Sequence, residues 1–308
     1  MTVLVTGGAG FIGNHMAERL VNGGNEIVVF DNFSTGRRDF LSGIDCKIIE
    51  GDVLNAEQIS AAVKGVTDVF HFVGDINVRG SVTNPIANFN TEVNGTLNTL
   101  EACRRNDVKS FVYSSSFWVY GNPQIVPTPE TSPIRPINNY GAAKAACEAY
   151  TSSYSELYGI SSTVLRYTAI MGPKLVARVV YDLFMKLKKN PNELEIFGDG
   201  SQTRGFVHVF DCVEGILVAK KAAAKPYDVF NIGSDDAITI KEIADLLVEM
   251  MQLKNVKYKF TGGSVGWKGD VAVMIESSEK LTKYGWHPRF TSRQAVIDSI
   301  NWLIENVK

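Results

Sequence analysis

Short apolar runs alternate with longer helical stretches through the first half of the chain. The six runs are rich in β-branched and aromatic residues and lie at 2–6, 26–30, 46–50, 68–72, 110–114 and 162–166. Helical patterns lie between them at 14–21, 56–63, 94–105 and 140–158. Near-continuous apolar strands are typical of parallel sheets covered on both faces. The pattern predicts an α/β fold with a doubly wound parallel sheet.

The alternation breaks after about Tyr167, where helical pieces mix with short strands and glycine-rich loops. These later helices are expected at 179–188, 240–251 and 292–306. Residues 204–232 again have a strand, helix, strand pattern. We therefore expect a first domain at 1–170 to which 204–232 returns, and a smaller mixed α/β C-terminal lobe at 171–203 and 233–308.

Charge and cysteine usage exclude several classes of partner. Lys and Arg total 31 against 33 Asp and Glu, so the net charge of −2 gives no cationic field for nucleic acid or anionic membranes. The four cysteines are far apart without a CxxC pair, and the four histidines have no ligand spacing, so no metal is expected. The first strand begins at residue 2 and no run of about 18 apolar residues follows. We expect a soluble cytoplasmic protein without a signal peptide.

The motif TGGAGFIG at 6–13 contains the GxGxxG pattern directly after an expected strand and before an expected helix. Asp31 follows 18 residues after Gly13, at the end of the next strand. This context is the dinucleotide fingerprint of a Rossmann fold, in which glycines let a pyrophosphate approach backbone N–H groups at a helix N-terminus. The backbone of the motif is expected to bind the cofactor at Gly7, Gly10, Phe11, Ile12 and Gly13.

Asp31 bears on the choice of cofactor. Its carboxylate would accept hydrogen bonds from the adenosine ribose and repel a 2′-phosphate, which favours NAD over NADP. Arg37 and Arg38 lie close enough in sequence to temper this preference. A glycine turn that only packs a helix on a strand is the alternative interpretation of the motif.

Tyr140 and Lys144 stand at i and i+4 of an expected helix, so both project from one face. A tyrosine with a pKa of about 10 needs a fall of roughly 3 units, about 4 kcal/mol, to act as a base at neutral pH. A unit positive charge about 4 Å away supplies about 4 kcal/mol at an effective dielectric of 20. Ser114–Ser116, at the end of a strand, would place a hydroxyl nearby. A surface Tyr–Lys pair and a serine turn are the alternatives.

Together these motifs resemble the extended short-chain dehydrogenase/reductase family of NAD-dependent epimerases and dehydratases. Within it the similarity is greatest to UDP-glucose (UDP-galactose) 4-epimerases, including the compact archaeal-type forms. The segments that carry the resemblance span nearly the whole chain and are TGGAGFIG, DNFSTG (31–36), GDV (51–53), HFVGD (71–75), SSSFWVYG (114–121), YGAAK (140–144), LRYTAIMGP (165–173), FGDGSQTRGFVHVFD (197–211) and YGWHP (284–288).

The resemblance implies a role for each matched residue. Ser116 is the catalytic hydroxyl, which also contacts the substrate, Tyr140 is the acid and base, and Lys144 is its cofactor-bound partner. Ribose and adenine contacts are implied for Asp31, Asn32, Asp52 and Val53. In the C-terminal lobe, Arg204 and Asp270 match positions that bind a nucleotide sugar. The implied reaction is epimerisation of a UDP-hexose at C4 through a 4-keto sugar, with NAD as the retained cofactor and a homodimer packed through the helices around 94–106 and 140–158.

Several positions depart from the family pattern. Phe117 and Trp118 stand where related dehydratases carry acidic residues, which disfavours elimination of water. Ala169 replaces an Asn, Trp267 stands in place of an Arg, and Glu92 replaces an amide near the nicotinamide. Another nucleotide-sugar epimerase, a reductase of the family, and a non-catalytic NAD-binding regulator are therefore the alternative functions.

Overall fold

The computed structural model describes residues 1–75, 77–224, 226–234 and 236–307 of the 308-residue chain. It forms two compact units, each assembled from separate segments. Unit 1 comprises Met1–Gly121, Pro133–Arg166 and Val213–Phe230, and unit 2 comprises Asn122–Ser132, Tyr167–Cys212 and Asn231–Lys308.

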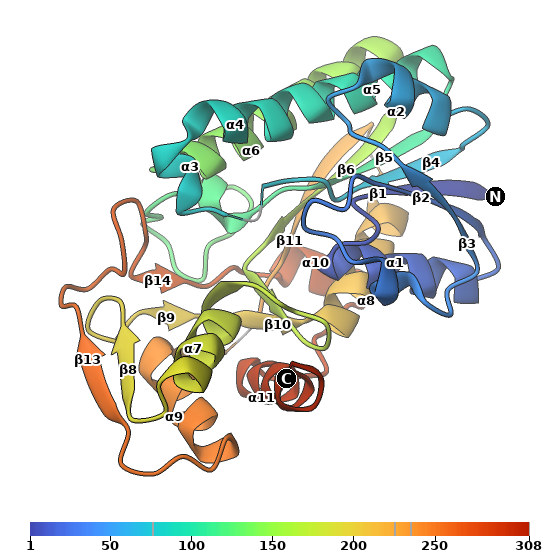
Figure 1. Ribbon diagram of the computed structural model, residues 1–308. Coiled ribbons are helices and arrows are strands. Elements are labelled where there is room, and N and C mark those ends of the chain that lie inside the picture. The colour runs from blue at the N-terminus through green and yellow to red at the C-terminus, as the bar shows by residue number, and fades with distance from the viewer. Residues whose placement is uncertain (76, 225, 235, 308) are drawn as a thin grey trace. The chain divides into compact units, whose positions relative to one another are not determined.

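A seven-stranded sheet is the centre of unit 1, with the strand order β11-β6-β5-β4-β1-β2-β3 (Figure 1). The register pairs β1 with β2 and β4, β2 with β3, β4 with β5, and β5 with β6, all in parallel. The strands are β1 (Thr2–Thr6), β2 (Glu26–Asp31), β3 (Cys46–Glu50), β4 (Asp68–His71), β5 (Ser110–Ser114), β6 (Ser161–Tyr167) and β11 (Tyr227–Ile232). The order reverses between β1 and β4, and ligands of doubly wound sheets bind beyond the carboxyl ends of strands at such a point.

Helices cover both faces of this sheet. Figure 1 shows α4, α5 and α6 along one face and α1 on the other. The helical segments are α1 (Phe11–Asn22), a 3₁₀ turn (Arg38–Leu41), α2 (Ala56–Ala62), α3 (Gly80–Thr83), α4 (Pro85–Phe89), a π-helical segment (Asn90–Asn94), α5 (Gly95–Arg105), a second 3₁₀ turn (Phe117–Val119), α6 (Asn139–Tyr158) and α8 (Val209–Ala222). The core beneath α2, α5 and α6 contains Leu4, Phe30 and Val69 from the strands and Leu100 and Cys147 from the helices. Most side chains of β1, β2, β4, β5 and β6 are buried on both faces, whereas the edge strand β3 is partly exposed.

Unit 2 contains three small sheets and four helices in its described part. Its strands pair as β10 with β7, β9 with β12 and β14, and β13 with β8. Its elements are β7 (Ala169–Met171), α7 (Arg178–Lys189), β8 (Glu193–Ile196), β9 (Thr203–Arg204), β10 (Phe206–His208), β12 (Ile238–Thr239), α9 (Ile240–Met250), β13 (Lys257–Phe260), β14 (Val273–Met274), α10 (Glu279–Thr282) and α11 (Ser292–Asn306). Across the described residues of both units, each helix is too short or too polar to cross a bilayer.

The predicted fold class is confirmed, and the six expected strands are β1 to β6 with ends that differ by at most one residue. The returning segment differs. The sequence pattern places the return at 204–232, whereas Val213–Phe230 is the segment that belongs to unit 1. The reason is that β9 and β10 pair with strands of unit 2. Residues 122–132 also belong to unit 2, where Thr128 N donates to Ile275 O at 2.9 Å.

Candidate active site

The glycine motif forms the turn between β1 and α1. Gly7 has a φ of +67°, which favours glycine, and its N–H donates to Phe30 O at 2.8 Å. Gly10 is the N-cap of α1, so the helix proper begins at Phe11 and Ile12. A Cβ on Gly13 would lie 2.2 Å from the carbonyl oxygen of Gly7. The helix can therefore approach the turn only with glycine at this position, and its first N–H groups face the end of β1.

Asp31, at the end of β2, is hydrogen-bonded to the glycine turn. Its carboxylate accepts the N–H of Ala9 at 2.9 Å and the N–H of Phe33 at 2.8 Å. Burial raises the pKa of Asp31, although the two N–H donors act in the opposite direction. Asn32 Nδ2 donates to Asp52 Oδ2 at 3.1 Å, so the ends of β2 and β3 are also joined. Val53 is 3% exposed and packs in the core beside them.

Arg37 and Arg38 already have carboxylate partners in this structure. Arg37 contacts Asp39 at 2.6 Å, and Arg38 pairs with Glu50 while its guanidinium lies 4.0 Å from the centre of the Phe33 ring. These exposed pairs are weak. They nevertheless reduce the positive charge that the two arginines could offer to a 2′-phosphate.

Helix α6 presents Tyr140 and Lys144 from its first two turns. Its N-cap is Asn138, whose side chain accepts the N–H of Gly141 at 2.8 Å. Tyr140 is 8% exposed, and its N–H donates to Ser81 Oγ at 3.2 Å. The ammonium of Lys144 lies 5.6 Å from the centre of the Tyr140 ring. The two side chains thus lie on the same face near the N-terminus of α6, as the i, i+4 spacing predicts.

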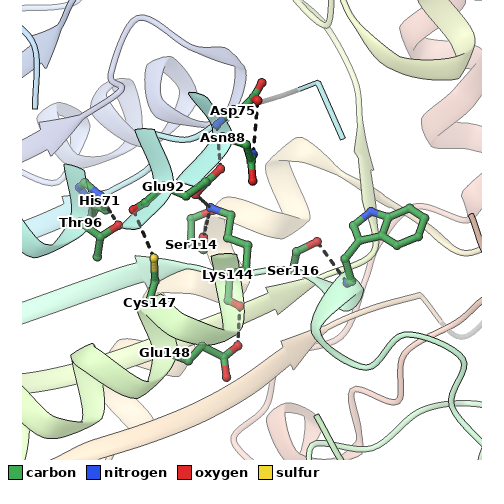
Figure 2. A network of polar contacts seen from close by, with 12 residues as sticks. His71, Asp75, Asn88, Glu92, Thr96, Ser114, Ser116, Lys144, Cys147 and Glu148 are labelled. Atoms are coloured by element: carbon green, nitrogen blue, oxygen red, sulfur yellow. Dashed lines mark hydrogen bonds and ion pairs between the residues drawn. The ribbon is translucent and has the colours of Figure 1, made fainter. Parts of the chain in front are cut away.

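Lys144 is held by two acceptors within the protein (Figure 2). Its Nζ lies 2.9 Å from Glu92 Oε2 and donates to Ser114 O at 2.9 Å. Both side chains of the ion pair are almost completely inaccessible to solvent. Burial disfavours the charge of Lys144, but the Glu92 carboxylate and Tyr140 together outweigh this and raise the pKa of the ammonium. The ammonium is thus positioned by one hydrogen bond, to Ser114 O, and one ion pair, with Glu92.

The three serines after β5 have three different roles. Ser114 contributes its carbonyl to Lys144, and Ser115 Oγ donates to the buried carboxylate of Glu148. Ser116 is the N-cap of the following 3₁₀ turn, where its Oγ accepts the N–H of Trp118 at 3.5 Å. No acceptor for the Ser116 hydroxyl proton lies among the described residues, so this hydroxyl can donate to a ligand. It is therefore the serine suited to the predicted catalytic role.

The turn at Ser116–Trp118 packs directly on the start of α6. A Cβ on Gly141 would lie 2.3 Å from the carbonyl oxygen of Trp118. This close approach explains why a glycine follows Tyr140. It also brings the segment that contains Ser116 next to the first turn of α6, which carries Tyr140. The predicted Ser116, Tyr140 and Lys144 thus come from one connected region of unit 1.

The predicted substrate residues Arg204 and Asp270 form a buried ion pair within unit 2. Arg204 Nη2 donates to Asp270 Oδ1 at 2.9 Å and to Val271 O at 2.8 Å, and Nη1 donates to Thr203 O and Ala272 O. Burial lowers the pKa of Arg204, and Asp270 acts in the opposite direction. Both terminal nitrogens are thus engaged in fixing the loop before β14. A contact of this pair with substrate stays a prediction.

Sequence reasoning missed the partner of Lys144. The Glu92 departure from the family pattern was the available signal, but the pattern does not show what the carboxylate contacts. Gly74 was missed as well. A Cβ there would lie 2.7 Å from Glu92 Oε1 and 3.1 Å from Lys144 Nζ, so the glycine leaves room for the ion pair. Among the described residues, no cluster of three His, Cys, Asp or Glu side chains could hold a metal ion.

Comparison with known proteins agrees with this geometry. Residues 3–233 match the model of the NAD dependent epimerase/dehydratase family. A putative UDP-glucose 4-epimerase of Methanocaldococcus jannaschii is 33% identical over 99% of each chain. A crystal structure of UDP-galactose 4-epimerase superposes with a TM-score of 0.92 at 38% identity over the whole of both chains. The UDP-glucose 4-epimerase of Thermotoga maritima, solved with UDP-glucose, superposes with a TM-score of 0.90 at 31% identity, again over both whole chains.

Proposed function

The chain belongs to the NAD dependent epimerase/dehydratase family, and from this premise we propose that it interconverts UDP-glucose and UDP-galactose by transient oxidation at C4 of the sugar. The observation that carries the proposal is the buried Tyr140–Lys144 pair packed against the Ser116 turn, beyond the end of β5. The similar proteins named above support the choice of a UDP-hexose.

The residues around the glycine turn fit NAD as the cofactor. Gly13 lets α1 pack closely on the turn, and Gly10, the N-cap of α1, leaves no side chain between the helix N-terminus and a pyrophosphate. Asp31 and Asp52 place carboxylates beyond β2 and β3, where the two ribose hydroxyls and the adenine of a dinucleotide would bind. Because Arg37 and Arg38 are paired with Asp39 and Glu50, the charge balance favours NAD over NADP.

We propose that Tyr140 moves the proton of the sugar 4-hydroxyl. As a phenolate it accepts this proton, and as a phenol it returns the proton to the C4 oxygen after the 4-keto sugar has turned over, so that hydride can add to the other face of C4. Lys144 favours the phenolate through its positive charge, and Ser116 donates a hydrogen bond to the reacting oxygen. NAD, when bound, supplies the acceptor for the C4 hydride and gives the hydride back.

Elimination of water is disfavoured by the residues that follow Ser116. The Phe117 side chain is completely buried and the Trp118 indole has no acidic proton at neutral pH, so neither can act as a general acid. Epimerisation needs only the single acid and base that Tyr140 provides.

The nucleotide half of the substrate would bind to unit 2. Arg204 and Asp270 are proposed to shape the loop that receives it, since their ion pair fixes residues 270–272. Phe197 is 39% exposed, with Lys186 Nζ 4.2 Å from its ring centre, and offers an aromatic face for the uracil.

We also propose a cytoplasmic homodimer that packs through α5 and α6. The apolar side chains on α6 that support this interface are Tyr150, Leu157 and Tyr158, which are 44%, 68% and 48% exposed. Exposed aromatic and leucine side chains gathered on one helix are typical of protein interfaces.

The proposal is tested with purified protein, without added cofactor. We expect NAD to be released on denaturation and UDP-galactose to be converted to UDP-glucose. Tyr140→Phe should lower turnover by about 10²–10⁴-fold while NAD stays bound. Tyr284→Phe, at a tyrosine of unit 2 that is 51% exposed, is the matched control that should remain active. Net consumption of a reduced nicotinamide would instead indicate a reductase, and full activity of Tyr140→Phe would exclude Tyr140 as the base.

A further inference from the structure

The carboxylate of Glu92 is an unusual neighbour for the catalytic lysine. Its side chain is completely buried, its Oε2 contacts Lys144 Nζ at 2.9 Å, and its Oε1 accepts the N–H of Asp75 at 2.7 Å (Figure 2). Glu92 lies in the π-helical segment Asn90–Asn94, which joins α4 to α5. Such segments interrupt the regular helical ladder and often occur at functional sites.

The residues around the Lys144–Glu92 ion pair leave room for it and hold its backbone in place. Gly74 has no side chain at the place where a Cβ would collide with Glu92 Oε1, and Cys147 Sγ donates to the Glu92 backbone carbonyl at 3.2 Å. Removal of one partner from a buried ion pair leaves an uncompensated charge, so each side chain holds the other in place. The ammonium is thereby fixed between Glu92 and Ser114.

On the basis of the proposed function, we propose that Glu92 is a positioning residue that fixes the Lys144 ammonium and whose negative charge sets the pH at which Tyr140 becomes a base. The Lys144 charge favours the phenolate, and a nearby carboxylate disfavours it. A chain with an amide at position 92 would lack the negative charge that disfavours the phenolate. Tyr140 in this protein therefore requires a higher pH for ionisation than it would with an amide at 92.

The other groups around Lys144 do not change the sign of this effect. Burial lowers the pKa of His71 to about 3, with Lys144 as the second cause, so the imidazole is neutral. Burial raises the pKa of the Cys147 thiol to about 11 and that of Tyr113 well above its usual value, so both are neutral too. Burial also raises the pKa of Glu92, and Lys144 opposes this. The titratable and charged groups that face the ammonium are His71 on β4, Glu92 in the π-helical segment, Tyr113 on β5, and Tyr140 and Cys147 on α6. Asp75, in the loop after β4, interacts with Glu92.

The test compares Glu92→Gln with Glu92→Asp, which keeps the charge. Two properties are measured against pH. The first is kcat for UDP-galactose, and the second is the phenolate absorbance of Tyr140 in the holoenzyme, obtained as the difference between each protein and its Tyr140→Phe counterpart. We expect Glu92→Gln to move the acid limb of kcat and the phenolate titration down by about one pH unit. Glu92→Asp should titrate like the parent protein, even if the shorter side chain lowers kcat.

Each outcome decides the proposal. Unshifted titrations in Glu92→Gln, or an equal shift in Glu92→Asp, would overturn it. If Glu92→Gln does not fold, Glu92→Asn is the second charge-neutral variant. If neither amide variant folds while Glu92→Asp does, the role of Glu92 is purely structural and the proposal is overturned. If the parent protein lacks epimerase activity but the phenolate titration still shifts, the proposed function fails while the electrostatic role of Glu92 stands.

Discussion

At the scale of single residues, His71 couples the stability of the protein to pH. The imidazole is fully buried between Thr6 and Thr96, and burial lowers its pKa from 6.5 to about 3. In the unfolded chain it would take up a proton below pH 6.5, so the unfolded state binds more protons between those two values. The free energy of unfolding should therefore fall as the pH is lowered through this window, by at most about 1.4 kcal/mol per pH unit from this residue.

Urea titrations of the parent protein and of His71→Asn measure this contribution. The asparagine keeps hydrogen-bonding capacity towards the threonines but does not titrate. The parent should lose more stability than the variant between pH 6.5 and about pH 3. Parallel pH profiles of unfolding for the two proteins would contradict the assignment of a neutral buried imidazole.

Residue types at fixed spacing were enough to predict that Tyr140 and Lys144 lie on one face of a helix, because helix geometry converts that spacing into proximity. The Lys144–Glu92 ion pair was not predictable in this way. It joins residues from separate elements, and its distance depends on a π-helical segment that periodicity does not indicate. The roles of Ser114, Ser115 and Ser116 likewise required the positions of their partners.

At the scale of elements, α6 carries the tyrosine and lysine in its first two turns, so its N-cap should affect both stability and catalysis. Asn138→Ala removes the hydrogen bond to Gly141 N and should lower the free energy of unfolding by about 1 kcal/mol. We expect kcat to fall about tenfold as well, because small displacements of reacting groups are costly. Thr239→Ala, at the capping box of α9 in unit 2, is the control. It should cost similar stability and leave kcat unchanged; an equal fall in kcat for both variants would contradict the link to the site.

Long periodic elements were predicted well for a physical reason. Strands β1, β2, β4, β5 and β6 are largely buried on both faces, and helices such as α6 have long regular patterns, so local sequence and tertiary packing favour the same structure. The short strands of unit 2 were not predicted individually. Strands of two to four residues, such as β9 and β12, contain too few side chains for a period to be detected.

At the scale of the whole molecule, the chain crosses between two units several times. The alternation of apolar runs and helical stretches was enough to predict the sheet of unit 1. The allocation of residues 122–132 and 204–212 to unit 2 was beyond sequence reasoning, because it rests on strand and loop pairing between distant segments.

The central claim is that one hydrogen leaves C4 of the sugar and returns to the same carbon within one turnover. The most direct measurement uses UDP-galactose carrying deuterium at C4, with the purified protein, no added cofactor and product analysis by NMR. We predict that the UDP-glucose formed retains deuterium at C4 and that the solvent acquires none. Product with ordinary hydrogen at C4, or no UDP-glucose at all, would contradict the account.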